Sequence, residues 1–334
     1  MSITADLVET AQRFAALEPA WRRLWAEAPE ATPFQSPDWL IPWWRHFHPG
    51  DLLTAAAWEG ERLVGLAPCY LEDGAHGRRI LPVGISVSDA LDVLLAPDRA
   101  GAAGRALVEA LAAVGARWDV WELEELAPGA ASLRLPVPDG CGDHASSQSA
   151  CPVLDLGAGS LAAAIPKAKL RKLRMARHRV ERAGGTVVPV GLDDLDGFLD
   201  ELARLHGLRW GARGEAGLLA DERLGMFLRD TARGFARAGL ARLHALRLGE
   251  RTIGAYYGFR HGTNSYAYFG GFDPAHTYES PGTVLIGHAI EEAIGEGATR
   301  FNLLRGQEAY KYEWGAVDCW NTHRRFTRAG ADDG

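Results

Sequence analysis

GERLVG at residues 60–65 returns as GERTIG at residues 249–254, and the expected architecture follows from this repeat. Each copy lies between two apolar runs, LLTAAAW and LAPCYL around the first, ARLHALRL and AYYGF around the second. A Gly-Glu-Arg turn between two such runs is typical of a β-hairpin. The chain is therefore expected to form two similar hairpins.

A helix and a strand follow each hairpin in the same order. GRALVEALAAVGARWDVWEL (104–123) and GHAIEEAIGEGATRFNLLRG (287–306) both have the pattern of an amphipathic helix, a glycine stop and a strand. Two matches in one order at nearly the same offset indicate an internal duplication. We expect two domains, residues 1–150 and 151–334. The Gly-, Pro- and Ser-rich seam at 127–160 is expected to be a linker or crossover.

The composition is that of an ordinary globular protein, with 334 residues, 47% hydrophobic and 24% charged. A net charge of -7 argues against nucleic-acid coating as the main activity, although it permits a local basic site. The four cysteines form no C-x-x-C pair, which argues against a disulfide framework or a metal site. The N-terminus lacks a signal-peptide pattern and no apolar run is long enough to span a membrane, so we expect a soluble, cytoplasmic protein.

A basic helix is predicted after the seam. In PKAKLRKLRMARHRVERAGG, residues 166–185, an apolar face is formed by Leu170, Leu173, Ala176 and Val180. The other faces carry eight Lys/Arg against one Glu. Such a surface could hold CoA phosphates, tRNA or a nucleotide-linked substrate, and the alternative is a solvated face.

These motifs resemble a known family. Hairpin, strand, helix, strand is the core order of the Gcn5-related N-acetyltransferase (GNAT) fold, and a tandem pair is the plan of the FemABX peptidyltransferases and the BioF2-like/CelD acetyltransferases. The closer similarity is to the BioF2-like/CelD group, and it covers about residues 30–326. The segments that resemble its motifs are TPFQSPDWLIPWW, SDALDVLLAP, LRKLRMARHRVERAGG, LHGLRWGARG, SPGTVLIGHAIEEAI and FNLLRGQEAYKYEWG.

The resemblance implies an α+β fold, an α/β sandwich of two tandem GNAT-like domains, each with a mixed, mostly antiparallel sheet flanked by helices. It also implies an acyltransferase that moves an acyl group from acyl-CoA, such as acetyl-CoA, to an amine of a small-molecule or peptide-like acceptor. Neither a metal nor a redox cofactor is implied.

One motif departs from the pattern. CoA-binding members usually carry Arg/Gln-x-x-Gly-x-Gly/Ala before the core helix, where this chain reads HTYESPGTVLIG, residues 276–287. FemABX proteins also lack a clean version, and they use aminoacyl-tRNA. A FemABX-like aminoacyl-tRNA-dependent transferase is therefore an alternative. A non-catalytic GNAT-fold binding or partner protein is another.

The donor site is predicted at the start of the C-terminal core helix. Ser280 and Pro281 are typical of an N-cap and a first helical position, and Gly282 and Thr283 follow them. The free N–H groups and the dipole of such a helix favour an anion, as in the pyrophosphate of CoA. An ordinary helix start is the alternative. The cations predicted to contact the donor are Lys169, Arg171 and Arg305.

The catalytic groups are predicted in RGQEAYKYEWG, residues 305–315, which follows the apolar run FNLL. Transfer to an amine needs a base and a positive donor for the oxyanion. Glu308 is the predicted base, with Asp273 as its rival, and Lys311 or Arg305 is the predicted cation. An aromatic-Lys motif is tied to the site in FemABX-like proteins, which implies this role for Lys311. The alternative is an ion-paired strand end.

The acceptor is expected to be bound by aromatic and polar side chains. The residues singled out for substrate binding are Trp39, Asp89, His206, Arg209, Trp210, Tyr310 and Trp314. Aromatic residues at helical spacing usually pack in cores, so packing is the alternative. The C-terminal copy is expected to bind the donor, and the N-terminal copy is expected to shape the acceptor cleft.

Overall fold

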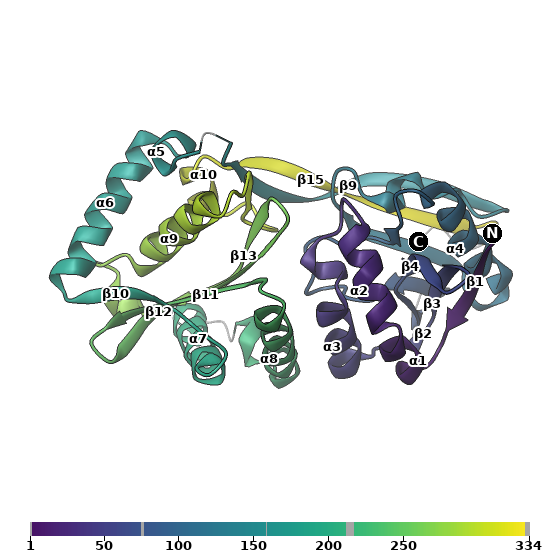
Figure 1. The fold of residues 1–334 in the computed structure, drawn as a ribbon, viewed down its shortest axis with the longest axis horizontal. Helices are drawn as coiled ribbons and strands as arrows, with labels where there is room; N and C mark the ends of the chain where they lie inside the picture. Colours follow the sequence, from purple (N-terminus) through teal and green to yellow (C-terminus); the bar gives the residue numbers. More distant parts are fainter. Residues whose placement is uncertain (1, 75–76, 158, 212–216, 331–334) are drawn as a thin grey trace. The chain divides into compact units, whose positions relative to one another are not determined.

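The computed structural model describes residues 2–74, 77–157, 159–211 and 217–330, without the side chains of residues 209–211 (Figure 1). The chain forms two compact units, one of Met1–Ser149 with Trp320–Gly334 and the other of Ala150–Cys319. Strands β9 (Cys141–Asp155) and β15 (Val317–Arg328) carry the chain from one unit to the other. The two domains expected from the sequence, residues 1–150 and 151–334, place residues 320–334 in the second domain, whereas the chain returns to the first unit there.

In the residues that the structure describes, the first unit is a pair of sheet segments with four α-helices. Its helices are α1 (Ala11–Ala16), α2 (Glu18–Glu27), α3 (Pro37–Phe47) and α4 (Ala100–Ala113). Its strands are β1 (Ile3–Val8), β2 (Asp51–Leu52), β3 (Thr54–Glu59), β4 (Arg62–Ala67), β5 (Cys69–Gly74), β6 (Gly77–Pro82), β7 (Leu94–Leu95) and β8 (Val120–Leu126). The strand orders are β1-β3-β4-β7 and β15-β8-β6-β5-β2. Strands β6 and β8 run parallel. The pairs β1–β3, β3–β4, β4–β7, β15–β8, β5–β6 and β2–β5 run antiparallel.

The second unit is built on strands in the order β10-β11-β12-β13-β14-β9. These are β10 (Gly185–Pro189), β11 (Ala241–Leu248), β12 (Arg251–His261), β13 (Asn264–Phe272) and β14 (Arg300–Asn302), followed by the end of β9. Its helices are α5 (Leu161–Ala164), α6 (Lys167–Arg182), α7 (Leu195–Gly211), α8 (Glu222–Arg237), α9 (Pro281–Gly295) and α10 (Ala309–Glu313). Helices α6 and α9 cover one face of the strands, and α7 and α8 cover the other (Figure 1). The predicted mixed, mostly antiparallel sheet with flanking helices is confirmed.

The two predicted hairpins, β3–β4 and β11–β12, are both present, and they share the same irregularity in strand pairing. Gly60 and Gly249 open the two turns with φ of 62° and 58°, a left-handed conformation that glycine adopts without strain. In each hairpin one residue of the second strand, Val64 or Ile253, is skipped in the pairing. A shared bulge at a shared distance from the turn is the structural mark of the repeat.

The seam expected to be a linker is partly a strand, because residues 141–155 form β9. The end of β9 pairs with β14, from Val153 to Asp155. Backbone pairing to a distant strand overrides the loop-like composition of this segment. None of the helices in the described ranges is long and apolar enough to cross a membrane.

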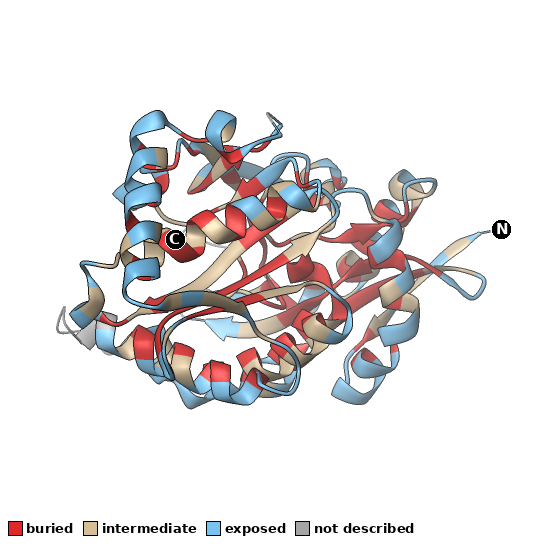
Figure 2. Cartoon of the chain, turned by 60° about the vertical axis from the view of Figure 1, so that its left-hand side comes forward, coloured by how far each residue is buried: buried red, intermediate tan, exposed pale blue. Residues whose placement is uncertain are grey.

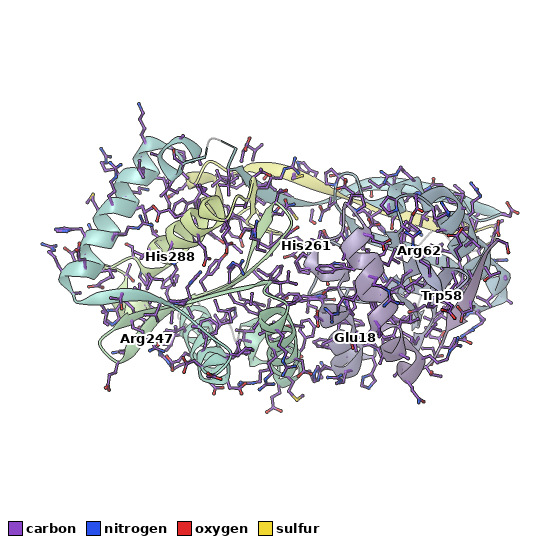
Figure 3. The ribbon with its side chains drawn as sticks, in the orientation of Figure 1. Glu18, Trp58, Arg62, Arg247, His261 and His288 are labelled. Carbon is purple, nitrogen blue, oxygen red and sulfur yellow. The ribbon has the colours of Figure 1, made fainter. Side chains whose placement is uncertain are left out.

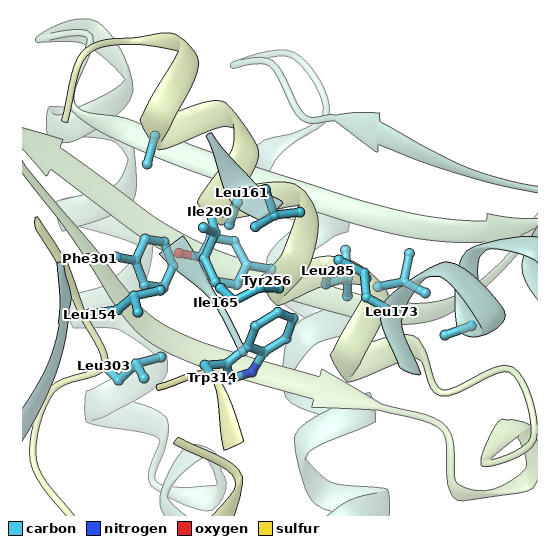
Figure 4. Close-up of a cluster of buried hydrophobic side chains, with 14 of the residues drawn as sticks. Leu154, Leu161, Ile165, Leu173, Tyr256, Leu285, Ile290, Phe301, Leu303 and Trp314 are labelled. Carbon is cyan, nitrogen blue, oxygen red and sulfur yellow. The ribbon is translucent and has the colours of Figure 1, made fainter. Parts of the chain in front are cut away.

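The core of the second unit lies between α6, α9 and the sheet. Buried residues concentrate in the strands and on the helix faces toward them (Figure 2). The apolar face predicted for the basic helix is confirmed, since Leu173, Ala176 and Val180 are buried. A Cβ atom on Gly287 would approach Leu173 to 2.6 Å, so glycine permits the close approach of α9 to α6. Tyr256 and Trp314 belong to the same cluster (Figure 4).

Candidate functional site

A cavity of about 430 Å³ lies in the second unit, a volume within the range of small-molecule sites. It is bounded by β12 and β13, by the first turn of α9, and by side chains from α6 and α10. Aromatic and aliphatic groups form most of its wall. The polar side chains that line it are Lys169, Tyr256, Tyr268, Thr277, Ser280, Thr283 and Tyr310.

The cavity follows from the way β13 and β14 part. The two strands pair in parallel only where residues 264–266 face residues 300–302. Strand β13 continues to Phe272, whereas the chain leaves β14 through Leu304 and Gly306, with φ of 61° and 104°. The later part of β13, from Tyr268 to Phe272, lines the cavity. Ligands commonly bind where the carboxyl ends of parallel strands separate in this way.

The first turn of α9 faces the cavity, because Ser280, Pro281, Gly282 and Thr283 all line it. The predicted helix start is confirmed, with Pro281 as the first residue and Ser280 before it. The predicted side-chain cap is wrong: Ser280 adopts a left-handed conformation, and its Oγ donates to the Thr277 carbonyl at 3.3 Å. Backbone N–H groups and the helix dipole therefore favour an anion at this rim.

Lys169 is the one Lys or Arg that lines the cavity in the described part of the chain. It is 5% exposed, and its Nζ lies 3.0 Å from Glu313 Oε2 and 4.5 Å from the centroid of the Trp314 ring. The hydrogen bond from Lys169 lowers the pKa of Glu313, which favours the carboxylate form of Glu313. A buried, oriented ammonium at a cavity wall is suited to hold an anionic or carbonyl oxygen.

Tyr256 supplies a buried phenol to the cavity wall. Burial raises the pKa of Tyr256, and its hydroxyl has no hydrogen-bond partner within the residues described. Its neighbour across the strands is His244, whose Nε2 lies 2.8 Å from Glu292 Oε2. His288 lies on α9, where Figure 3 labels it. Its ring packs against His244 with centroids 4.6 Å apart. The hydroxyl oxygen itself is shielded from solvent, so Tyr256 contributes its ring to the cavity wall.

Lys311 is bonded inside the turn that follows β14. It is 2% exposed, and its Nζ donates to the carbonyl oxygens of Leu304, Arg305 and Gly306 at 3.0, 2.6 and 3.0 Å. The fourth contact is with Glu308 Oε2, at 2.9 Å. Three converging carbonyls suit a compact ammonium better than a planar guanidinium, which accounts for an isolated lysine at this position.

The two predicted bases differ in their surroundings. Glu308 precedes α10 with its side chain 55% exposed, whereas Asp273 is 4% exposed. Asp273 accepts hydrogen bonds from Ala275 N–H at 3.0 Å and from Arg251 at 2.6 Å. The Ala275 bond, aided by the charge of Arg251, lowers the pKa of Asp273 and makes it a weak base near neutral pH.

The cavity brings part of the predicted site together. The predicted residues that line it are Lys169, Ser280, Gly282, Thr283, Tyr310 and Trp314. The predicted residues of the same unit that do not line it are Arg171, Arg305, Glu308, Lys311, Asp273 and His206. His206 lies on α7 against the other face of the sheet, where its ring packs edge-on against Phe269 with centroids 5.8 Å apart.

The other residues predicted to bind the acceptor substrate do not line this cavity or have side chains outside the described residues. Trp39 and Asp89 belong to the first unit, where the Trp39 side chain is fully buried and donates to Ser88 Oγ at 2.9 Å. Arg209 and Trp210 lie in the last turn of α7, and their side chains are outside the described residues. Their roles in substrate binding stay predictions.

Sequence reasoning missed the aromatic residues that β12 and β13 contribute, namely Tyr256, Tyr268 and Phe272. The signal was the alternation in AYYGF, which places Tyr256 and Tyr257 on opposite faces of one strand. Tyr257 approaches Thr231 of α8, whose Oγ1 lies 3.4 Å from its hydroxyl. Its neighbour Tyr256 is the one that faces α9.

The first unit has a cavity of its own, of about 380 Å³, beside the first turn of α4. Asp92 lines it, and burial raises the pKa of Asp92 to about 6. That carboxyl already accepts from the backbone N–H groups of Val93, Ala131 and Ser132 and from the Ser132 hydroxyl. Asp92 therefore stabilises the segment after β8 through these hydrogen bonds. Across the described ranges, no group of three or more His, Cys, Asp or Glu could hold a metal ion.

Comparison with known proteins gives one family match and a set of structural relatives. Residues 167–312 match the family model described as the acetyltransferase (GNAT) domain, and no curated protein matches the chain. Among solved structures, FemX has 11% identity and a TM-score of 0.62, with 97% of each chain covered.

Two further solved structures share the architecture. A conserved protein of unknown function from Bacteroides thetaiotaomicron has 14% identity and a TM-score of 0.59, with 97% of this chain and 100% of that chain covered. The C-terminal domain of a putative lysylphosphatidylglycerol synthetase from Agrobacterium fabrum has 14% identity and a TM-score of 0.57, with 97% and 94% covered. At these identities the solved structures show a shared fold, and the family model lies within the second unit.

Proposed function

Because residues 167–312 match the acetyltransferase (GNAT) domain and the chain shares its fold with FemX, we propose that this protein is an N-acyltransferase whose second unit binds an acyl-CoA, such as acetyl-CoA, in the cavity beside α9. The acyl group is transferred to an amine of a small-molecule or peptide-like acceptor. The observation that carries the proposal is the first turn of α9, which faces a cavity opened by the parting of β13 and β14.

The proposed binding mode follows the chemistry of the wall. The pyrophosphate meets the N-terminus of α9 at Gly282 and Thr283, and the arm of the donor lies along the later part of β13. The apolar wall around Phe272 and Trp314 excludes water from the thioester. Lys169 is the proposed hydrogen-bond donor toward oxygens of the acyl donor.

The proposed transfer is a single exchange of bonds at the thioester carbonyl carbon. The acceptor nitrogen forms the new C–N bond and releases one proton to Glu308, and the C–S bond breaks with its electron pair on sulfur. The resulting thiolate takes up a proton and leaves as free CoA. Lys311 is proposed to position the turn after β14, because its ammonium contacts Glu308 and the backbone carbonyls there. Trp39 and Asp89 are retained as proposed acceptor contacts.

Acetyl-CoA and free CoA should raise the melting temperature of the full chain, because a ligand that binds the folded state stabilises it by mass action. Isothermal calorimetry with the same ligands measures the affinity directly. Pantetheine alone serves as the control that lacks the pyrophosphate. If neither CoA nor acetyl-CoA binds at millimolar concentration, the proposed donor is wrong.

The FemABX resemblance implies an aminoacyl-tRNA donor as the second candidate, and a surface of α6 favours it. Its basic stripe consists of Lys167, Arg171, Arg174 and Arg182, which are exposed and share one helical face. The stripe is about 23 Å long at the rise of an α-helix. None of the four has an ion pair with another residue that the structure describes. A row of unneutralised cations is suited to a phosphate backbone.

Replacing all four stripe residues with glutamine separates the two donors. For a tRNA donor, we expect weaker tRNA binding and a salt dependence reduced by about 3 in slope, since each phosphate contact contributes roughly 0.7. The matched control is Lys172→Gln with Arg177→Gln, because these two cations are already paired with Glu313 and Glu291. Gel shifts across a salt series measure the effect. Unchanged tRNA binding in the stripe variant would leave the stripe as a solvated face.

A further inference from the structure

We propose that Tyr278 and Arg179 form a stacking site for the adenine ring at the nucleotide end of the donor. This inference rests on the proposed function, because it assigns a second part of the same ligand to residues beside the cavity. It identifies the donor as an adenine nucleotide by the chemistry of an aromatic ring and a guanidinium.

Tyr278 is an exposed aromatic residue in a segment that reaches the cavity. The residue is 61% exposed, although large aromatic rings gain most from burial. The residues beside it in this segment, Thr277 and Ser280, line the cavity, and α9 begins at Pro281. A ligand whose diphosphate meets the first turn of α9 therefore has its remaining groups close to Tyr278.

Arg179 holds the Tyr278 ring from one side. Its Cζ lies 4.5 Å from the ring centroid, and its Nη1 donates to the Tyr278 carbonyl oxygen at 3.0 Å. The guanidinium thus covers one ring face and fixes the backbone beneath it. Since Tyr278 is 61% exposed as a residue, we infer that its other ring face is open to solvent. A tyrosine held in this way can stack on a planar base without losing further side-chain freedom.

The same helix contributes to both ends of the proposed site. Lys169 lines the cavity and Arg179 holds Tyr278, and the two lie ten residues apart on α6, about 15 Å along its axis. Arg179 also brings a positive charge to the place where the phosphates of a nucleotide would lie. Adenine stacking and charge attraction therefore favour the same ligand.

Arg179 and Tyr278 are not needed to hold α6 against α9. The contact between α6 and α9 is already made by Arg177, which binds both carboxylate oxygens of Glu291 at 2.8 and 2.5 Å. Gly287 and Leu173 pack the two helices together one turn before that ion pair on each helix. An exposed ring adds little to this contact, since most of its surface remains in water.

Calorimetry with CoA and with S-acetylpantetheine tests the inference. Base stacking on an aromatic side chain contributes enough for Tyr278→Ala to weaken CoA binding by about tenfold. Tyr278→Phe should bind CoA as the unaltered chain does, because it keeps the ring. S-acetylpantetheine lacks the nucleotide, so its affinity should be the same in both variants. Arg179→Ala should weaken CoA binding, whereas the matched control Arg177→Ala should not.

The outcomes distinguish this inference from the proposed function. Equal CoA affinity in Tyr278→Ala, or an equal loss for both ligands, overturns the stacking site and leaves the acyl-CoA proposal intact. Absence of binding by both CoA and S-acetylpantetheine overturns the acyl-CoA proposal. Adenosine 3′,5′-bisphosphate then tests the stacking site alone: binding that Tyr278→Ala weakens supports it, and absence of binding overturns it. Tyr278→Leu is the second variant if the alanine variant does not fold, because it keeps apolar bulk without a π face.

Discussion

Lys311→Met should lower the free energy of unfolding by about 3 kcal/mol, because it leaves three carbonyl oxygens without their shared donor. The acceptors are the carbonyls of Leu304, Arg305 and Gly306, and Leu304 is buried. Urea unfolding curves measure the change. Lys172→Met is the matched control, since its lysine is 62% exposed with one contact of 3.4 Å, and it should change stability by less than about 0.5 kcal/mol.

The same variants separate a structural from a catalytic Lys311. An ammonium that stabilises the oxyanion supplies about 3 kcal/mol to the transition state, so its loss would reduce turnover about a hundredfold in a protein of unchanged stability. The carbonyl contacts predict instead that stability falls together with activity. Lys311→Arg should restore little of the stability, because a planar guanidinium does not match three converging acceptors. Full stability of Lys311→Met with lost turnover would establish the catalytic role.

Gly282→Asp should reduce the affinity for acetyl-CoA by about fivefold or more. A carboxylate about 4 Å from a phosphate costs between about 1 and 4 kcal/mol, depending on solvent exposure. The fold should tolerate the change, since a Cβ at Gly282 would lie 3.5 Å from the Phe272 ring, an ordinary contact. A negative charge in the first turn of α9 is also favourable to the helix, by about 0.3–1 kcal/mol.

Gly282→Asn is the matched control, because it has the shape of aspartate without the charge. Calorimetry at low and high salt compares the two variants. The aspartate variant should lose affinity most at low salt, where charge repulsion is least screened. If both variants bind acetyl-CoA equally, the pyrophosphate does not meet this helix.

The parts of the fold that local rules determine could be predicted from the sequence. Each Gly-Glu-Arg turn needs a left-handed glycine, and the residues around it alternate, so both hairpins follow from short-range chemistry. Long-range pairing could not be predicted. Nothing in residues 317–328 indicates that this strand pairs with β8, because the same composition fits any edge of a sheet.

The candidate site shows the same division. Composition singled out Lys311, but its partners are backbone carbonyls, which look alike in every sequence. Ser280 was predicted as a cap because of its position before Pro281, and its left-handed backbone turns the side chain elsewhere. Tyr278 lies in HTYESPGTVLIG, but nothing in that segment assigns it a role. It emerges only when its exposure and the Arg179 contact are known.

The return of β15 to the first unit determines where the chain can be cut. A fragment that ends at residue 319 loses the partner of β8, which pairs with residues 322–327, so truncation at the C-terminus damages the unit that contains the N-terminus. Residues 1–149 expressed alone would expose an unpaired strand edge, which favours aggregation. By contrast, Ala150–Cys319 is one continuous stretch of chain. For protein engineering, the proposed donor site therefore lies in a segment that can be exchanged between relatives with two joints, provided that the final strand stays with its original first half.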